Sequence, residues 1–109
     1  MRVLFTLKVR EHTIYLIRIL YEKEYFGFEE AAKKYVDDLI IDIKMNLPTM
    51  QHKPAPKYFD KYGKGMYYAS FKKNKQTTWY AFFSKYKEKE ETIYLIRYIA
   101  NNHIVAQYL

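Results

Sequence analysis

The sequence predicts an α+β domain in which one strand is followed by a two-helix antiparallel hairpin and then by a three-stranded antiparallel meander. Three observations support this fold class. A short apolar run at residues 2–7 has β character, and residues 9–47 carry apolar side chains at helical spacing. Residues 66–99 contain runs of β-branched and aromatic residues separated by short polar turns. The hairpin should cover one face of the sheet.

Length and composition set the first limits on function. A chain of 109 residues corresponds to one domain with one core, and a hydrophobic content of 50% favours folding over disorder. The absence of cysteine excludes disulfides and thiolate metal sites. We expect no metal site and no cofactor, because the histidines are isolated from one another and from suitable carboxylates. We also expect a cytoplasmic protein without a membrane partner, since no apolar run has the length of a signal peptide or a membrane span.

The net charge of +7 is distributed unevenly along the chain. Residues 1–50 contain eight Lys/Arg and eight Asp/Glu, which sum to zero. Residues 51–109 contain eleven Lys/Arg and four Asp/Glu, and therefore carry the whole excess of +7. The second half is thus a candidate surface for an anionic partner. A lysine-rich solubilising surface is the alternative.

The first helix is predicted from residue 9 onward, where apolar residues begin to recur on one face. It contains the hexapeptide Thr-Ile-Tyr-Leu-Ile-Arg at residues 13–18, and the same six residues recur at 92–97. Because the flanking sequences differ, we interpret the identity as coincidence rather than as an internal repeat. The longer frame predicts a helix for the first copy, although local propensity alone favours a strand for both.

The second helix follows a break at residues 25–27 that includes Gly27. Its apolar stripe extends from Phe28 to Leu47, and Glu29 and Glu30 lie in the first turn, where the helix dipole favours negative charge. Pro48 ends it. Residues 48–56 then hold all three prolines and predict an irregular connector.

The meander is predicted from three strands, at residues 66–72, 77–86 and 92–99. The intervening turns are residues 73–76 and 87–91, and such short polar connections favour antiparallel pairing. The tail, residues 103–109, fits either a last helical turn or a short edge segment. Arg97 interrupts the most β-prone run of the chain, which suggests a task that needs a fixed positive charge.

Five stretches of the chain follow one another in an order that is informative as a whole. They are residues 4–8 (LFTLK), 27–39 (GFEEAAKKYVDDL), 62–68 (YGKGMYY), 79–83 (WYAFF) and 93–98 (IYLIRY). In this order and spacing they resemble the RelE/ParE superfamily of toxins from bacterial type II toxin–antitoxin modules. The resemblance covers nearly the whole chain.

The resemblance implies a small basic toxin that is neutralised by a cognate antitoxin protein. Two activities occur on this fold, namely cleavage of mRNA on the ribosome by RelE-like members and poisoning of DNA gyrase by ParE-like members. The second helix resembles the ParE branch more closely, which favours gyrase as the target. A metal-independent mRNA endonuclease and a degenerate, non-toxic binding module are the alternatives.

The resemblance also implies candidate catalytic residues for the nuclease alternative. RelE-like members use arginines and lysines on the sheet face together with a tyrosine near the C-terminus. Here Tyr108 matches that tyrosine, Lys72 matches the basic residue of the second family strand, and Arg97 lies in the last strand. Where the family usually has a basic residue after this strand, this chain has Asn101 and Asn102. His103 follows them and is the candidate substitute, since its unperturbed pKa suits acid–base catalysis.

Each candidate also has a structural interpretation. His103 fits a loop or capping residue, Tyr108 fits packing, and Arg97 fits an ion pair with Asp or Glu. Lysines near the turns are candidates for contacting the nucleic acid or another target, although solvation alone would explain them; they are Lys61, Lys64, Lys73 and Lys75. The aromatic residues of the second predicted strand, Trp79, Phe82 and Phe83, are expected in the core.

Overall fold

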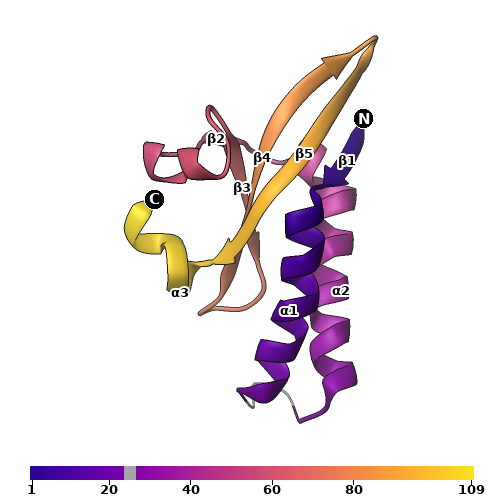
Figure 1. Cartoon of the computed structure of the whole chain (residues 1–109), viewed down its shortest axis with the longest axis vertical. Helices are drawn as coiled ribbons and strands as arrows, with labels where there is room; N and C mark the ends of the chain where they lie inside the picture. The colour runs from indigo at the N-terminus through magenta and orange to yellow at the C-terminus, as the bar shows by residue number, and fades with distance from the viewer. Residues whose placement is uncertain (24–26) are drawn as a thin grey trace.

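The computed structural model of the chain describes residues 1–23 and 27–109. Strand β1 (Arg2–Phe5) leads into helices α1 (Leu7–Glu22) and α2 (Glu29–Asn46), and the strands β2 (Lys53–Pro54), β3 (Tyr67–Lys72), β4 (Thr78–Glu88) and β5 (Glu91–Asn101) follow. Three short 3-10 helices, η1 (Leu47–Thr49), η2 (Lys57–Lys61) and η3 (Ala106–Tyr108), and the single-turn helix α3 (Asn102–Val105) complete the described elements. The predicted α+β order is therefore confirmed (Figure 1).

The strands form one five-stranded sheet in the order β1-β5-β4-β3-β2. The meander predicted for the second half is confirmed, because β3, β4 and β5 pair antiparallel. Strand β1 lies beside β5 and runs parallel to it, with Val3 opposite Tyr94 and Phe5 opposite Ile96. The two helices make the crossover that a parallel connection requires. The last long strand is thereby placed between the first strand and the rest of the sheet.

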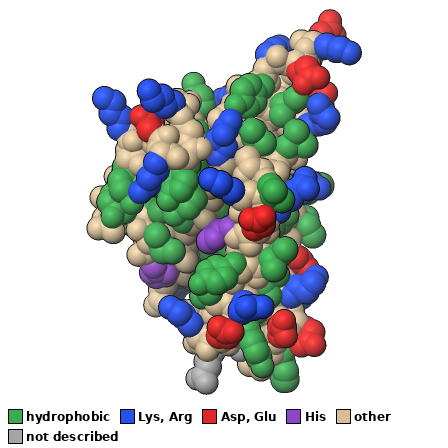
Figure 2. Space-filling view, viewed as in Figure 1, with side chains coloured by type: hydrophobic (Ala, Val, Ile, Leu, Met, Phe, Trp, Pro, Cys, Tyr) green, Lys and Arg blue, Asp and Glu red, His purple; other side chains and the backbone are tan. Residues whose placement is uncertain are grey.

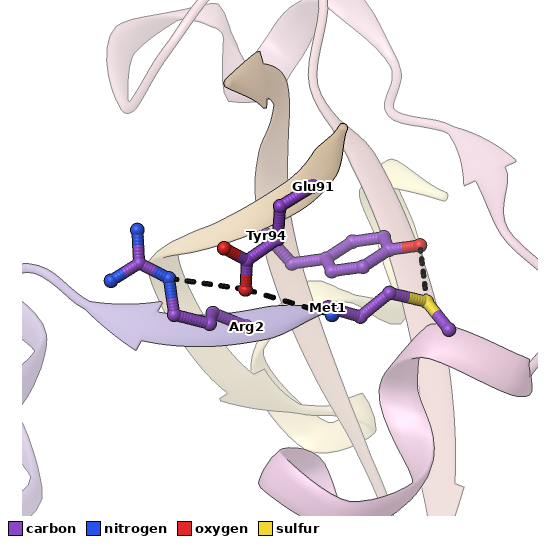
Figure 3. Close-up of polar contacts among 4 residues, drawn as sticks. All are labelled: Met1, Arg2, Glu91 and Tyr94. Atoms are coloured by element: carbon purple, nitrogen blue, oxygen red, sulfur yellow. Dashed lines mark hydrogen bonds and ion pairs between the residues drawn. The ribbon is translucent and has the colours of Figure 1, made fainter. Parts of the chain in front are cut away.

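Polar contacts at the N-terminus hold β1 against β5 (Figure 3). The Glu91 carboxylate lies 3.3 Å from Arg2 Nε and 3.6 Å from the terminal ammonium of Met1. The Tyr94 hydroxyl donates to the Met1 sulfur at 3.9 Å. These groups are partly exposed, so the ion pairs contribute little energy and mainly fix the register of the strand.

Helices α1 and α2 lie side by side on one face of the sheet, called here the helix-side face (Figure 1). Thr6 caps α1, since its hydroxyl accepts a hydrogen bond from the Val9 amide at 3.2 Å. The shared core draws one stripe from each helix and every second residue of the strands. Its buried members include Val9, Leu16, Val36, Leu39, Ile43, Ala69, Phe71, Trp79, Ala81, Phe83, Ile96 and Ile99.

A second, smaller core lies on the opposite face of the sheet, called here the far face. Phe59 of η2 and Val105 of α3 pack there with Phe82 and Ala100 of the sheet. Partly buried tyrosines surround this core; they are Tyr62, Tyr68, Tyr80, Tyr98 and Tyr108. Figure 1 shows the C-terminal segment on the side of the sheet away from α1 and α2. Only part of the far face is covered, because β4 and β5 extend beyond η2 and α3.

The two copies of the repeated hexapeptide adopt different structures, as predicted. The copy at 13–18 lies within α1, and the copy at 92–97 lies within β5. In β5 the side chains of Tyr94 and Ile96 reach the helix-side core, while in α1 Leu16 does so at helical spacing. Tertiary burial therefore overrides a local β-propensity that is identical in both copies.

Several predicted boundaries were wrong. The first strand ends at Phe5 rather than residue 7, because Thr6 caps α1 and Leu7 is already helical. The connector contains the short strand β2 and a 3-10 turn, and the expected five-residue turn before the last strand is reduced to Lys89 and Glu90, with Lys89 at φ 57°. For the tail, residues 103–109, the structure shows the helical one of the two predicted forms, since it consists of α3 and η3. Of the break at residues 25–27, only Gly27 lies within the described residues.

Residues 1–23 and 27–109 contain no helix that is long and apolar enough to cross a membrane.

Replacement of a core isoleucine should distinguish the two sides of α2. Ile43 is 0% exposed, whereas Ile41 on the same helix is 56% exposed. We expect Ile43→Ala to lower the free energy of unfolding by about 2–5 kcal/mol through lost burial and a residual cavity. Ile41→Ala should change it by less than about 0.5 kcal/mol. Urea denaturation followed by circular dichroism measures both, and equal losses would contradict the described packing.

Candidate functional site on the far face

A β-bulge in β5 determines which side chains reach the far face. Phe82 pairs with Tyr98 and Phe83 pairs with Ile96, so Arg97 is an extra residue with no partner on β4. Because of this insertion, Ile96 and Ile99 both point into the helix-side core although they are three positions apart. Arg97 and Tyr98 both lie on the opposite side. The bulge thus places a cation and an aromatic ring together on the far face.

The Arg97 side chain lies along β4. Its Nε donates to the Ser84 hydroxyl at 2.9 Å, and its Nη2 donates to the Tyr86 hydroxyl at 2.8 Å. Both acceptors are neutral, and no ion pair of the described residues includes Arg97. Among the described residues, Arg97 therefore does not form the ion pair with Asp or Glu that the sequence allowed as an alternative. The guanidinium is held in place while its charge stays uncompensated.

Gly63 lies against the Cδ and Nε atoms of the Arg97 side chain. A Cβ atom at Gly63 would lie 2.7 Å from Arg97 Cδ and 3.2 Å from Arg97 Nε, which is closer than such atoms approach. A residue with a Cβ atom would push the Arg97 side chain aside, whereas glycine allows this close approach. It lets the loop after η2 lie directly on the arginine. Lys64, the next residue, is exposed.

Arg97 changes the acidity of Tyr86. The hydrogen bond from the guanidinium lowers the pKa of the Tyr86 phenol below its ordinary value, because it stabilises the phenolate. Tyr86 is 46% exposed, so its hydroxyl is accessible from solvent. Neither Ser84 nor Tyr86 was among the residues that the sequence singled out.

Two stacked tyrosine pairs attach η2 and the C-terminal segment to this region. The Tyr62 and Tyr98 rings stack with centroids 3.9 Å apart, and the Tyr58 and Tyr108 rings stack at 3.6 Å. Burial raises the pKa of Tyr98, with a further contribution from its hydrogen bond to Tyr62. The phenol of Tyr98 therefore stays protonated.

Lys61 lies against the outer pair of tyrosines. Its Nζ is 4.0 Å from the Tyr58 ring centroid. A hydrogen bond with Lys61, followed by one with Tyr108, lowers the pKa of Tyr58, and the same contact with Tyr58 raises the pKa of Lys61. Hydrogen bonding to Tyr58 raises the pKa of Tyr108. Tyr108 thus packs against Tyr58 in a surface cluster.

The last residue of β5 and the segment that follows it make structural contacts. Asn101 caps α3, since its side chain accepts from the His103 amide at 3.0 Å. Asn102 accepts from the Thr78 amide at 3.0 Å and donates to the Gln76 carbonyl at 3.1 Å, which ties α3 to the turn before β4. The exposed His103 ring lies 3.5 Å from the Thr77 hydroxyl. Asn101 and Asn102 are the residues at which the resemblance implied a positive charge.

The predicted lysines are exposed or near the turn between β3 and β4. Lys72 ends β3 opposite Thr78 and, by strand alternation with buried Phe71, lies on the far face. Lys75 is exposed in the turn. Lys73 instead reaches the helix side, where its Nζ is 5.7 Å from the Tyr35 ring.

The four predicted catalytic residues do not form one cluster. Within residues 1–23 and 27–109, no hydrogen bond, ion pair or ring contact joins any two of Lys72, Arg97, His103 and Tyr108. Arg97 has Ser84 and Tyr86, His103 has Thr77, and Tyr108 has Tyr58 as its partner. The arrangement around Arg97 therefore defines a different set, namely Arg97, Ser84, Tyr86 and Gly63, which we call the Arg97 cluster. The sequence signal for this cluster was Arg97 itself, a charge within an apolar strand, and it gave no indication of Ser84, Tyr86 or Gly63.

A small hollow adjoins the Arg97 stem on the side of α1. Its volume is about 190 Å³, and its lining includes Lys8, Val9, His12 and Tyr62. Burial lowers the pKa of His12. Ligand pockets usually exceed about 300 Å³, so this hollow is too small to be the principal site. No group of three or more metal-ligating side chains occurs in the described part of the chain.

Comparisons of the chain with protein-family models, with curated proteins and with solved structures return no match. What defines the site is its chemistry. The far face combines an uncompensated arginine, lysines around η2 and tyrosine rings, and Figure 2 shows Lys and Arg side chains scattered among hydrophobic ones over one view of the surface. Such a surface fits a polyanion that also carries flat rings.

Replacing Arg97 should restore the ordinary acidity of Tyr86. In Arg97→Met the phenolate loses its donor, so the pKa of Tyr86 should rise. NMR titration of tyrosines labelled at the ring carbon bearing oxygen measures this, and Tyr86→Phe assigns the signal among the 13 tyrosines. A pKa of Tyr86 that is the same in both proteins would show that the contact does not exist in solution.

Gly63→Ala should produce a smaller change in the same direction. The added methyl group would displace Arg97 at its Cδ atom and weaken the hydrogen bond to Tyr86. Gly27→Ala is the matched control, because nothing lies within 4 Å of a Cβ at that position. The same titration, with both variants checked for folding by circular dichroism, should show a rise in the Tyr86 pKa only for Gly63→Ala.

Proposed function

We propose that this protein is a growth-inhibiting toxin of the RelE/ParE type and that its far face, centred on Arg97, contacts RNA. The order of elements and the resemblance of five sequence stretches support the first part. The single observation that carries the second part is the Arg97 guanidinium, which two neutral hydroxyls hold in place without a carboxylate.

A fixed and unpaired arginine favours a phosphate ligand. The guanidinium presents several N–H groups in one plane and binds phosphate oxygens through two parallel hydrogen bonds. Here Ser84 and Tyr86 occupy Nε and Nη2, which leaves the remaining N–H groups for an external acceptor. Since both partners are hydroxyls, they do not compete with a phosphate for the charge.

The surroundings favour RNA over an isolated phosphate. Tyr86 is 46% exposed, and Lys61 and Lys64 are exposed at the end of η2 and in the loop after it. Exposed aromatic rings beside lysines stack on unpaired bases while the cations follow the backbone. The net charge of the second half of the chain has the sign that this requires.

Among toxins of this type, the Arg97 cluster favours the mRNA endonuclease over the gyrase inhibitor. The sequence ranked gyrase first because the second helix resembles the ParE branch more closely, and the replacement of a basic residue by Asn101 and Asn102 agreed with that ranking. Both asparagines support α3 and the turn before β4, and Arg97 supplies a charge on the far face. The missing basic residue therefore weighs less against RNA cleavage than the sequence alone suggested.

Inhibition of gyrase through protein contact is the second candidate. It is favoured by large apolar side chains that the helices expose to solvent; they are Leu7, Ile14 and Tyr21 of α1 and Ile41 and Met45 of α2. In either case a cognate antitoxin is the proposed partner and the cytoplasm the proposed compartment. A non-toxic binding module would show neither activity.

Controlled expression in a bacterium tests these alternatives. We expect the wild-type chain to arrest growth and to produce mRNA breaks that map to translating ribosomes, without gyrase-linked DNA breaks. Arg97→Met should reduce mRNA cleavage at least tenfold, since a charge-assisted hydrogen bond contributes about 1.5–3 kcal/mol. Arg18→Met, an exposed arginine of α1, is the control and should cleave like wild type.

Two results would contradict the proposal. DNA breaks without mRNA cleavage would assign the chain to the gyrase inhibitors instead. Unaffected growth with neither signal, at an expression level verified by immunoblot, would leave only a binding module.

A further inference from the structure

We propose that Tyr86 is the general acid of RNA cleavage at the Arg97 cluster, the residue that gives its proton to the leaving 5′-oxygen. This inference rests on the proposed function and deepens it. The resemblance to toxins pointed to Tyr108 as the tyrosine of interest, whereas the contacts on the far face point to a different one.

The position of Tyr86 is the first argument. Its hydroxyl lies 2.8 Å from Arg97 Nη2, so a phosphate bound by the remaining N–H groups of Arg97 would lie beside the phenol. The side chain is 46% exposed and can meet a substrate without rearrangement. Proton transfer requires this hydrogen-bond proximity to the reacting group.

The second argument is the hydrogen-bond arrangement at the phenol oxygen. Arg97 donates to this oxygen, and a hydrogen bond with Ser84 also lowers the pKa of Tyr86. A phenol oxygen accepts two hydrogen bonds while its own proton points to an external acceptor. When the proton leaves, the guanidinium stabilises the phenolate that forms. The lowered pKa of Tyr86 expresses the same interaction.

The reaction is balanced as a transesterification within the RNA. The 2′-oxygen attacks phosphorus and forms a new P–O bond, and the proton of the 2′-hydroxyl passes to water. The bond between phosphorus and the 5′-oxygen breaks, and that oxygen takes the proton of Tyr86. Arg97 neutralises charge on the phosphorane. The products are a 2′,3′-cyclic phosphate and a 5′-hydroxyl, and water returns a proton to Tyr86.

Other tyrosines of the far face fit this role less well. Tyr98 is half-buried with a raised pKa, and the pKa of Tyr108 is raised by its bond to Tyr58. Tyr58 also has a lowered pKa, but Lys61 lies over its ring and Tyr108 stacks on the same ring. These two contacts leave less room for a substrate beside the Tyr58 phenol. Tyr86, in contrast, accepts a hydrogen bond from the guanidinium that we propose as the phosphate ligand.

The test compares Tyr86→Phe with wild type on programmed ribosomes carrying a short synthetic mRNA. We expect the single-turnover cleavage rate to fall about 100-fold or more, in the range typical of a lost general acid, while the affinity for the ribosome changes less than about threefold. Tyr15→Phe on α1, which is 57% exposed, is the matched control and should cleave at the wild-type rate.

A chemical rescue separates proton donation from a structural role. In a second mRNA, sulfur replaces the 5′-oxygen at the mapped cleavage position, and a thiolate leaves without a proton. We expect Tyr86→Phe to cleave this substrate at nearly the wild-type rate. An equal defect on both substrates, or loss of ribosome binding, would overturn the role of Tyr86.

The outcomes also separate this inference from the proposed function. If the wild-type chain cleaves mRNA and Tyr86→Phe cleaves it equally well, the general acid is another group and only this inference fails. If Tyr58→Phe alone gives the defect that sulfur rescues, the role belongs to Tyr58. If the wild-type chain cleaves no mRNA, the proposed function and this inference both fail.

Discussion

The bulge at Arg97 is the constraint on which both faces of the sheet depend. Strand β5 lies between β1 and β4 and contributes to both cores, so its side chains must satisfy two sets of neighbours. Regular alternation would send Ile96 and Tyr98 to one face and Arg97 and Ile99 to the other. The extra residue instead lets Ile96 and Ile99 pack under the helices while Arg97 and Tyr98 face outward. Core packing and the composition of the far face are thus set by the same irregularity.

The open part of the far face is polar because η2 and its tyrosines cover the apolar part. Tyr62 stacks on Tyr98, and Phe59 fills the small core beneath η2, so aromatic contacts close the lower part of the face. Gly63 then brings the chain across the Arg97 stem without a side chain between them. The guanidinium end stays open beside Tyr86. A half-buried charge with only neutral partners is costly to hold unless it has a use, which is why we assign it a ligand.

The basic character of the second half of the chain has a different origin from that of Arg97. Lys61, Lys64, Lys72 and Lys75 are exposed, and in the proposed function each would contribute a screened charge that attracts the RNA from a distance. Arg97 acts at short range and in a fixed geometry. In the proposed function the lysines therefore attract the RNA and Arg97 orients it. Salt should weaken the contribution of the lysines more than that of Arg97.

Much of the fold followed from the sequence by itself. Helical spacing predicted α1 and α2, polar turns predicted the antiparallel meander, and the charge count located the basic half. Arg97 was also identified, because a charge within a strongly apolar strand needs a reason. These features are local, so neighbouring residues determine them.

Only the tertiary structure decided the remaining features. The parallel pairing of β1 with β5 joins residues about ninety positions apart, and no local pattern encodes it. The hexapeptide shared by α1 and β5 becomes a helix in one place and a strand in the other because different cores bury it. Ser84, Tyr86 and Gly63 meet Arg97 through the bulge and through the loop after η2. The site depends on these long-range contacts, which is why the sequence identified its arginine and missed the residues that hold it.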